Sequence, residues 1–114
     1  MTTIYKICAR TAWEEAEAAG RYAGSEVDRR DGFIHFSTAA QVRETAALYF
    51  AGAEDLMLVA VDAGVLDRAL KWEVSRAGDL FPHLYGELPL GAVLWAKPLP
   101  LGRDRQHLFP ELAP

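Results

Sequence analysis

The sequence predicts an α+β protein of one domain, residues 1–114, with two small, mostly antiparallel sheets and two early helices. The length fits a single domain that can bury a core of its own. Both helical signals lie in the first half of the chain, and the later strand-like segments are joined by loops. A doubly wound parallel sheet would need a helix between successive strands, so this order favours the α+β class.

The first strand and the first helix follow directly from local sequence patterns. Residues 4–9 are mostly apolar, which predicts a strand. Thr11 and Glu14 have the spacing of a capping box and predict a helix over residues 12–19. Gly20 then ends this helix as a left-handed cap.

The next segment is predicted to hold a connection, a strand and the second helix. Residues 21–30 are polar and mixed in charge, which indicates a connection with at most a short strand or turn. An Asp-Gly turn signal precedes the short apolar strand 33–36. Thr38 and Gln41 form a second capping box, so a helix is predicted from there to about Phe50. Tyr49 is expected on its apolar stripe, in the core, with its hydroxyl at a polar rim.

The second half is predicted to consist of strands and loops. Residues 56–61 form a continuous apolar run, which is typical of a central strand buried on both faces. Residues 70–75 alternate, which predicts a strand with Leu70, Trp72 and Val74 toward the core and Glu73 on the opposite face.

The final segments are predicted from their prolines and aromatic residues. Residues 81–86, Phe-Pro-His-Leu-Tyr-Gly, are expected to form a rigid aromatic loop. Residues 92–97 are predicted as the last strand, which Pro98 and Pro100 would stop. The tail, residues 102–114, is expected to dock through Leu108 and Phe109.

The strand around His35 offers the first candidate site. Alternation places His35 and Ser37 on one face, at the end of a strand. A helix beginning after Thr38 would present free N–H groups beside them, which is an arrangement that binds anions. The competing interpretation is a half-buried structural histidine followed by ordinary helix caps.

The segment around His83 offers the second candidate site. A rigid loop would present His83 and Tyr85 to a cleft, with Glu73 on a neighbouring strand. We expect the two histidine segments to converge, so that both imidazoles line one concave surface. The competing interpretation is an aromatic loop folded over the core, with Glu73 paired to a surface cation.

Other catalytic chemistry has little support in the sequence. The three histidines lack the spacing of a metal-ligand pair, so no metal site is predicted. There is no nucleophile-elbow signature for a serine triad and no glycine-rich phosphate loop. Cys8 lies in mid-strand without local activation, which argues against a cysteine nucleophile.

Composition and charge are those of an ordinary globular protein, with 51% hydrophobic and 25% charged residues. The net charge of −4 argues against nonspecific nucleic-acid binding, which requires a basic face. Cys8 is the single cysteine, so no internal disulfide is possible and a reducing cytoplasmic location is expected. No signal-peptide pattern and no apolar run of membrane-spanning length occur, so no membrane association is expected.

Taken together, residues 31–38, Trp72-Glu73 and residues 81–86 resemble the bacterial and plant family named domain of unknown function 952. The resemblance extends from residue 4 to about residue 100. It implies a fold like that of the ADP-ribosyltransferases, which bind NAD in a cleft between two small sheets. By that resemblance, His35-Phe36-Ser37 would contact the NAD ribose and Glu73 would orient the reacting ribose, with Glu87 as the weaker alternative.

The leading functional hypothesis is a protein that binds NAD or a related nucleotide. His35, Ser37 and the N–H groups after Thr38 would hold ribose and phosphate, and Tyr49 and Tyr85 would pack on a ring. His83 and Glu73 would be the catalytic pair, because both residue types can move protons near neutral pH. Transfer or hydrolysis at a ribose C1′ would then be the reaction. The alternatives are a non-catalytic module that binds a metabolite or peptide, and an interaction domain with structural histidines.

Overall fold

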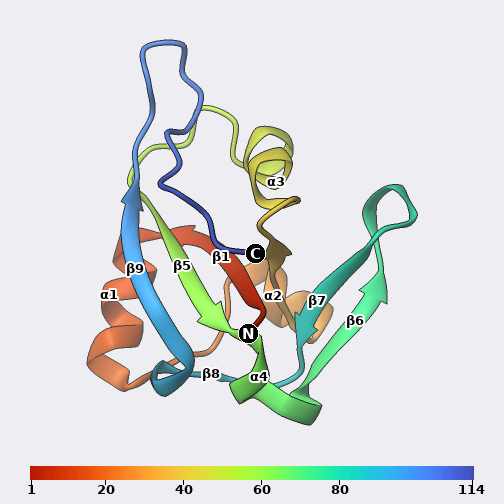
Figure 1. Ribbon diagram of the computed structural model, residues 1–114. Coiled ribbons are helices and arrows are strands. Elements are labelled where there is room, and N and C mark those ends of the chain that lie inside the picture. The colour runs from red at the N-terminus through yellow and green to blue at the C-terminus, as the bar shows by residue number, and fades with distance from the viewer.

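A four-stranded antiparallel sheet forms the centre of the molecule in the computed structural model, which describes residues 1–114 (Figure 1). The strand order is β4-β1-β5-β9. Strand β1 (Thr3–Ala9) pairs along its whole length with β5 (Leu56–Asp62), which pairs in turn with β9 (Val93–Leu99). Strand β4 (Ser37–Thr38) pairs with β1 at two positions only. Most of the outer edge of β1 is therefore left without a neighbouring strand.

Each face of this sheet carries its own hydrophobic cluster. Helix α1 (Arg10–Ala19) contributes Trp13 to the larger cluster, which includes Val59 of β5. Helix α3 (Val42–Tyr49) contributes Ala46 to the smaller cluster on the opposite face. Strand β5 is buried on both faces, which confirms its prediction as a central strand.

Two smaller antiparallel sheets complete the architecture. One pairs β2 (Arg21–Tyr22) with β8 (Leu88–Pro89). The other has the order β3-β7-β6 and consists of β3 (Ile34–His35), β7 (Leu80–Leu84) and β6 (Leu70–Val74). The β6–β7 hairpin extends away from the central sheet on the right of Figure 1. The α+β class is confirmed, with three small antiparallel sheets where two were expected.

The polar segment 21–30, predicted as a connection, contains most of a helix. Helix α2 (Glu26–Asp31) begins at a complete capping box between Ser25 and Asp28 and ends at Gly32, whose φ of 88° is left-handed. A helix of six residues with mainly polar side chains has no apolar periodicity to detect. Its position nevertheless matters, because α2 carries Asp28 into the interior.

Short helical turns connect the remaining elements: α4 (Ala63–Leu66), η1 (Asp67–Ala69), η2 (Arg76–Gly78) and η3 (Leu90–Ala92). The Cα radius of gyration is 13.2 Å, which fits a compact domain of this length. None of the helices has the length and apolar character needed to cross a membrane.

Helix α1 begins earlier than its predicted start at Ala12. It starts at Arg10, and the capping residue Ala9 provides no side-chain hydrogen bond. Thr11 therefore lies inside the helix and does not cap it. The Arg10 guanidinium instead joins the helix start to the β5 entry, with its Nε 2.6 Å from Asp55 Oδ1.

Helix α3 begins later than predicted, at Val42. Thr38 remains in β4, and its N–H donates to Gln41 Oε1 at 3.0 Å, so only half of the expected capping box forms. The predicted placement of Tyr49 in the core is wrong, because its side chain is exposed at the last turn. The stripe rotates away from the sheet there, so Ala46 is buried and Tyr49 is not.

The facing predicted for β6 is also wrong over most of its length. Trp72 is 42% exposed and Val74 69% exposed, and only Leu70 packs against the larger cluster. Side chains of β6 do alternate between two faces, but β6 is the outer strand of a hairpin that extends beyond the core. Glu73 lies on the opposite face, as predicted, and that face meets β7 side chains.

The segment 81–86, expected to be a loop, contributes most of β7. Pro82 is accommodated because of its position in the hydrogen-bond pattern. Ser75 N–H donates to Asp79 C=O, and this pairing directs the odd-numbered residues of β7 toward β6. The N–H that proline lacks would point away from β6, so the β6–β7 ladder loses no hydrogen bond.

The last strand and the tail also differ in part from expectation. Strand β9 continues through Pro98 to Leu99, because an edge strand tolerates a missing N–H on its free side. In the tail, Phe109 packs against the smaller cluster, whereas Leu108 is exposed. Docking through Phe109 is confirmed, and docking through Leu108 is wrong. The end of the tail is held where Tyr5 OH donates to Ala113 C=O at 2.7 Å.

We predict that tail docking depends on Phe109. The change Phe109→Ala should lower the free energy of unfolding by at least about 1 kcal/mol, because it removes apolar contact with the core. The neighbouring change Leu108→Ala, at an exposed side chain, should stay within about 0.5 kcal/mol. Urea denaturation of both variants measures the difference, and equal losses would contradict the assignment.

Candidate functional site

A cleft of about 940 Å³ runs along the open edge of β1. Its lining includes consecutive β1 residues, Tyr5 to Ala9, because β4 stops pairing with β1 after Tyr5. Helices α1 and α2 contribute to the lining from one side and α3 from the other, and η2, β3 and β7 add further residues. The strand edge that the short β4 leaves uncovered therefore becomes the floor of a concave site.

The two predicted histidines lie side by side in this cleft. Strands β3 and β7 are antiparallel, and their register places His35 directly opposite His83. Their ring centroids are 5.5 Å apart in an edge-on arrangement, and both residues line the cleft. Phe33 packs against both, with centroid distances of 4.1 Å to His83 and 4.6 Å to His35. The expected convergence of the two segments is confirmed.

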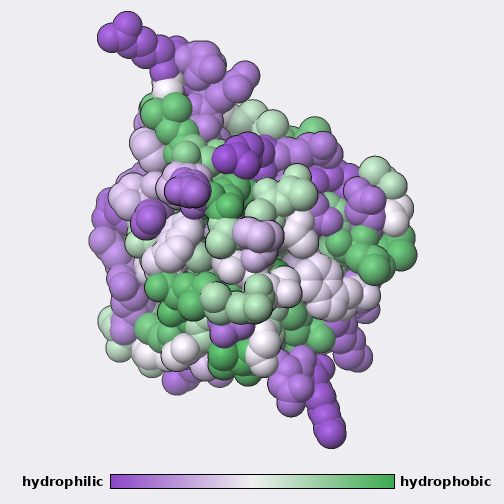
Figure 2. Space-filling view, viewed as in Figure 1, coloured by the Kyte–Doolittle hydropathy of each residue, from purple (hydrophilic) through white to green (hydrophobic).

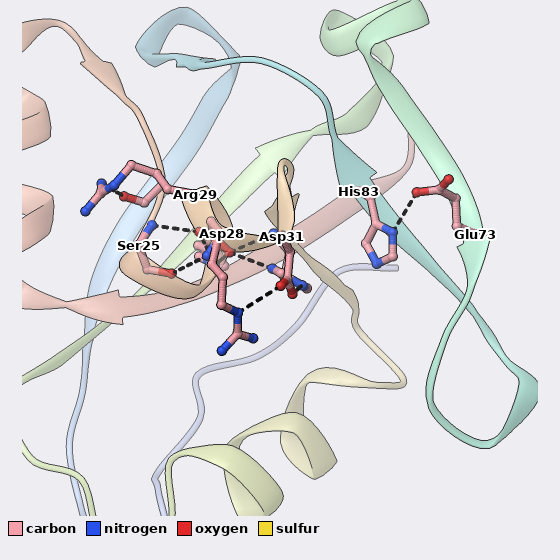
Figure 3. A network of polar contacts seen from close by, with 10 residues as sticks. Ser25, Asp28, Arg29, Asp31, Glu73 and His83 are labelled. Carbon is pink, nitrogen blue, oxygen red and sulfur yellow. Dashed lines mark hydrogen bonds and ion pairs between the residues drawn. The ribbon is translucent and has the colours of Figure 1, made fainter.

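His83 is oriented by a carboxylate on the side away from the cleft. Its Nδ1 lies 2.8 Å from Glu73 Oε1, and Figure 3 shows Glu73 reaching it from β6. Tyr85 OH donates to the same oxygen at 2.7 Å. The hydrogen bonds from Tyr85 and His83 lower the pKa of Glu73, so the carboxylate stays charged. A charged acceptor at Nδ1 keeps the proton on that nitrogen and leaves Nε2 as the acceptor in neutral His83.

The second ring nitrogen of His83 is free of protein partners. The ring is buried, but Nε2 makes no hydrogen bond within the chain. The buried, unpartnered side-chain polar atoms are Trp13 Nε1 and Tyr22 OH, so His83 Nε2 retains some solvent contact. Because His83 lines the cleft, this nitrogen is available to a molecule bound there.

His35 belongs to a larger polar network centred on Asp28. Asp28 Oδ1 lies 2.7 Å from His35 Nδ1, and Asp28 Oδ2 lies 2.8 Å from Lys6 Nζ. The Ser25 and His35 N–H groups also donate to this carboxylate. The other ring nitrogen, His35 Nε2, lies 3.1 Å from Asp31 Oδ2. Figure 3 shows Asp28 and Asp31 on the opposite side of His83 from Glu73.

The electrostatics of Asp28 are set by two opposing effects. Burial raises its pKa, but the hydrogen bond from His35 and the charge of Lys6 outweigh burial and hold the pKa well below its ordinary 3.8. Both Lys6 and Asp28 are buried, so each charge depends on the other. The Asp28 carboxylate therefore stays ionised at neutral pH and fixes His35 in place.

A cationic side chain lies at the α3 side of the cleft. The Nη atoms of Arg76 are each 3.4 Å from Thr45 Oγ1, which is 2.9 Å from Ser37 Oγ. The guanidinium lies over the Phe81 ring at 4.8 Å and the Tyr49 ring at 5.9 Å, and its Nε pairs with Glu44. Hydroxyls, a guanidinium and aromatic faces thus meet where Ser37 enters the cleft.

The predicted site residues divide into two groups. His35, Ser37, Tyr49 and His83 line the cleft. Thr38, Glu73 and Tyr85 do not line it, although Glu73 and Tyr85 support His83 from behind. The Thr38 N–H donates to Gln41, and the helix begins only at Val42, so Thr38 does not stand at the start of a helix. Glu87 pairs with Arg21 at 3.1 Å and makes no contact with either histidine.

Sequence reasoning missed Lys6, Asp28 and Arg76. A signal for Asp28 was present in the Ser25-x-x-Asp28 spacing, which is a capping box. Lys6 stands alone among apolar neighbours in β1, which is typical of a buried ion pair. Arg76 lies in a turn, and no sequence pattern there indicates its contacts. No group of three or more His, Cys, Asp and Glu side chains is placed to hold a metal ion.

We predict that the Lys6–Asp28 pair is a major contributor to stability. Asp28→Asn should lower the free energy of unfolding by about 3 kcal/mol or more, because it leaves a buried ammonium without its counter-charge. The double change Lys6→Met with Asp28→Asn should recover part of that loss. Urea denaturation at pH 7 tests both, and a double variant no more stable than Asp28→Asn would contradict this view.

The same carboxylate predicts an acid dependence with a definite sign. A pKa that is lower in the folded state means that the stabilising contribution is complete above the ordinary value of 3.8. The contribution is lost as the pH falls below that value toward the folded pKa. In urea denaturation from pH 6 to pH 2, the wild type should therefore lose more stability than the double variant of Lys6 and Asp28. Parallel losses would contradict the assignment.

Cys8 should react slowly although it contributes to the cleft lining. The side chain is buried, and burial raises the pKa of its thiol to about 11. Iodoacetamide at pH 8 should therefore alkylate the native protein at least about tenfold more slowly than the urea-unfolded protein. Mass spectrometry of timed samples measures this ratio, and equal rates would show an accessible thiolate.

Comparison with known proteins places this chain in a family. The structures of protein CC0527 from Caulobacter crescentus are similar: a crystal structure has 48% identity and a TM-score of 0.90, covering 94% of each chain. A solution structure of CC0527 has 49% identity and a TM-score of 0.83, covering 93% of this chain and 91% of that one. No match was found among curated proteins. The model of the family described as protein of unknown function (DUF952) matches residues 7–96, and the chain therefore belongs to the DUF952 family.

Proposed function

We propose that the cleft binds a ribose-containing nucleotide, NAD or a close relative, in an ADP-ribosyltransferase-like site. The observation that carries this proposal is the pair of cleft-lining imidazoles, 5.5 Å apart, each anchored by a carboxylate at Nδ1. Such an arrangement suits a ligand rich in hydroxyl groups, because His83 Nε2 and the Asp31 carboxylate beside His35 both line the cleft and can form directional hydrogen bonds. The cleft volume of about 940 Å³ is sufficient for a dinucleotide.

Different walls of the cleft would take different parts of this ligand. The Arg76 guanidinium and the hydroxyls of Ser37 and Thr45 would bind phosphate oxygens, since a guanidinium gives charge-assisted hydrogen bonds. The exposed Tyr49 ring would pack on a base.

The reaction that fits this site is transfer or hydrolysis at the ribose C1′. The bond from C1′ to the nicotinamide nitrogen breaks, and nicotinamide leaves as a neutral molecule with the electron pair. An oxygen nucleophile bonds to C1′ and gives its proton to His83 Nε2. Glu73 would act as a positioning residue, because its contact is with Nδ1 of His83 and not with the cleft. It would stabilise the imidazolium that forms.

A second function, binding without turnover, is favoured by one observation at His35. Both of its ring nitrogens lie within 3.1 Å of carboxylate oxygens, of Asp28 and Asp31. A histidine held at both ring nitrogens is fixed in orientation and has no free nitrogen, so it would shape the binding site and not exchange protons with a ligand. The two functions differ in whether nicotinamide is released from bound NAD.

Calorimetry and product analysis with matched variants test the proposal. Wild-type protein should bind ADP-ribose, and Arg76→Ala should weaken that binding at least about tenfold, because a charge-assisted contact to phosphate is lost. Arg103→Ala, at an exposed arginine without an ion pair, should leave affinity unchanged. No heat and no thermal shift with NAD or ADP-ribose would overturn the proposal.

Nicotinamide release separates catalysis from binding. His83→Ala should reduce the release rate by about 100-fold or more while changing NAD affinity much less, because proton transfer is lost. Glu73→Gln should lower the rate less and alter its pH profile, as expected for a positioning residue. The control is His107→Ala, a histidine whose Nε2 bonds to Ala53 C=O and which does not line the cleft. Binding without release in the wild type would support the second function.

A further inference from the structure

Strand β6 has an open outer edge with regularly spaced backbone groups. It is the terminal strand in the order β3-β7-β6. Ser75 N–H donates to Asp79 C=O and Tyr85 N–H donates to Ala69 C=O, so the odd-numbered residues of β6 face β7. The N–H and C=O groups of the even-numbered residues therefore point outward. Leu70, Trp72 and Val74 carry these unpaired groups.

The same edge is flanked by exposed apolar side chains. The register pairs Val74 with Leu80 and Trp72 with Pro82, so these four side chains share one face. Val74 is 69% exposed, Leu80 52% and Trp72 42%. Hydrophobic residues gather over this hairpin at the right of Figure 2. An exposed edge with apolar side chains favours strand pairing between molecules.

The other outer strand of comparable length contains a proline, and β6 does not. Strand β9 carries Pro98 near its end, and a proline discourages pairing of an edge with another chain. Strand β6, with the sequence Leu-Lys-Trp-Glu-Val, has no proline and has tryptophan at its centre. Its two charged residues, Lys71 and Glu73, are placed symmetrically about Trp72.

We propose that β6 pairs antiparallel with β6 of a second copy of this chain, across a two-fold axis at Trp72. Antiparallel pairing of identical strands permits three registers with good overlap, centred on residue 71, 72 or 73. Centring on Lys71 or on Glu73 places like charges directly opposite each other, which is unfavourable. Centring on Trp72 places Lys71 opposite the partner's Glu73, and it also overlaps the whole strand.

The hydrogen-bond pattern independently permits this register. A two-fold axis can pass between two identical residues whose N–H and C=O groups point toward the other strand, and the groups of Trp72 point outward in this way. Leu70 would then pair with the partner's Val74 and the two tryptophans with each other. The exposed indoles would bury each other, and the three-stranded sheets of the two copies would become one continuous sheet.

In the single chain, Lys71 and one oxygen of Glu73 have no hydrogen-bonded partner of opposite charge. Lys71 makes no ion pair, and its Nζ lies over the Tyr85 ring at 5.1 Å. Glu73 Oε1 accepts from His83 and Tyr85, and Glu73 Oε2 accepts no hydrogen bond within the chain. The partner's Lys71 would reach Glu73 from the open side. The dimer contact would thus adjoin the carboxylate that orients His83, without depending on which ligand the cleft binds.

Sedimentation velocity over roughly 10 µM to 1 mM tests the pairing. The wild type should approach twice the chain mass of 12.6 kDa as concentration rises. Trp72→Lys should remain monomeric over that range, because it places like charges at the two-fold axis. The matched control is Leu94→Lys, on the β9 edge and 44% exposed, which should associate as the wild type does. A wild type that stays monomeric, or a dimer insensitive to Trp72→Lys, would overturn the proposal.

A charge-exchange experiment tests the register itself. Lys71→Glu gives a chain with carboxylates at both positions, and Glu73→Lys gives a chain with ammonium groups at both. Each variant alone should dimerise at least about tenfold more weakly than the wild type, because like charges then lie opposite each other. Mixing the two variants should restore association, because every cross-strand pair is then of opposite charge. Circular dichroism establishes that each variant is folded. A mixture that associates no better than either variant alone would exclude pairing centred on Trp72.

Discussion

The buried ion pair between Lys6 and Asp28 is the contact on which the rest of the site depends. It joins β1 of the central sheet to α2, and the same carboxylate holds His35 of β3. The Asp28 carboxylate thereby fixes β1 to α2 and to β3, the strand that follows α2 in the chain. Because neither charge is exposed, each would be costly without the other, and the geometry around His35 is correspondingly rigid.

The short length of β4 determines where the cleft lies. Had β4 continued along β1, the backbone edge from Ile7 onward would be covered and no cleft would exist. The chain instead turns away at Phe36, whose N–H donates to Pro82 C=O in the other sheet. Phe36, which belongs to neither β3 nor β4, therefore marks the point where the chain leaves β1. Its bond to Pro82 brings β7, with His83, to the cleft wall.

The two histidines make the same kind of hydrogen bond in different surroundings. Each presents Nδ1 to a carboxylate, but Asp28 is buried and charge-paired, whereas Glu73 lies at a half-exposed strand edge. His35 is therefore enclosed by acids, and His83 keeps a free Nε2 at the cleft. Under the proposed function, this asymmetry would give His35 a positioning role and His83 a role in proton transfer. Glu73 lies between the cleft and the open β6 edge.

Local patterns in the sequence were sufficient for the α+β class, the central strand β5 and the convergence of His35 and His83, because apolar runs and paired aromatic motifs reflect burial directly. Tertiary context decided the outward facing of Trp72 and Val74, the exposure of Tyr49 and the strand conformation around Pro82. It also decided the contacts of Lys6, Asp28 and Arg76. Alternation along a strand does not reveal which strand lies at an edge, and a charge in the sequence does not reveal its partner. Both are determined only when distant segments pack together.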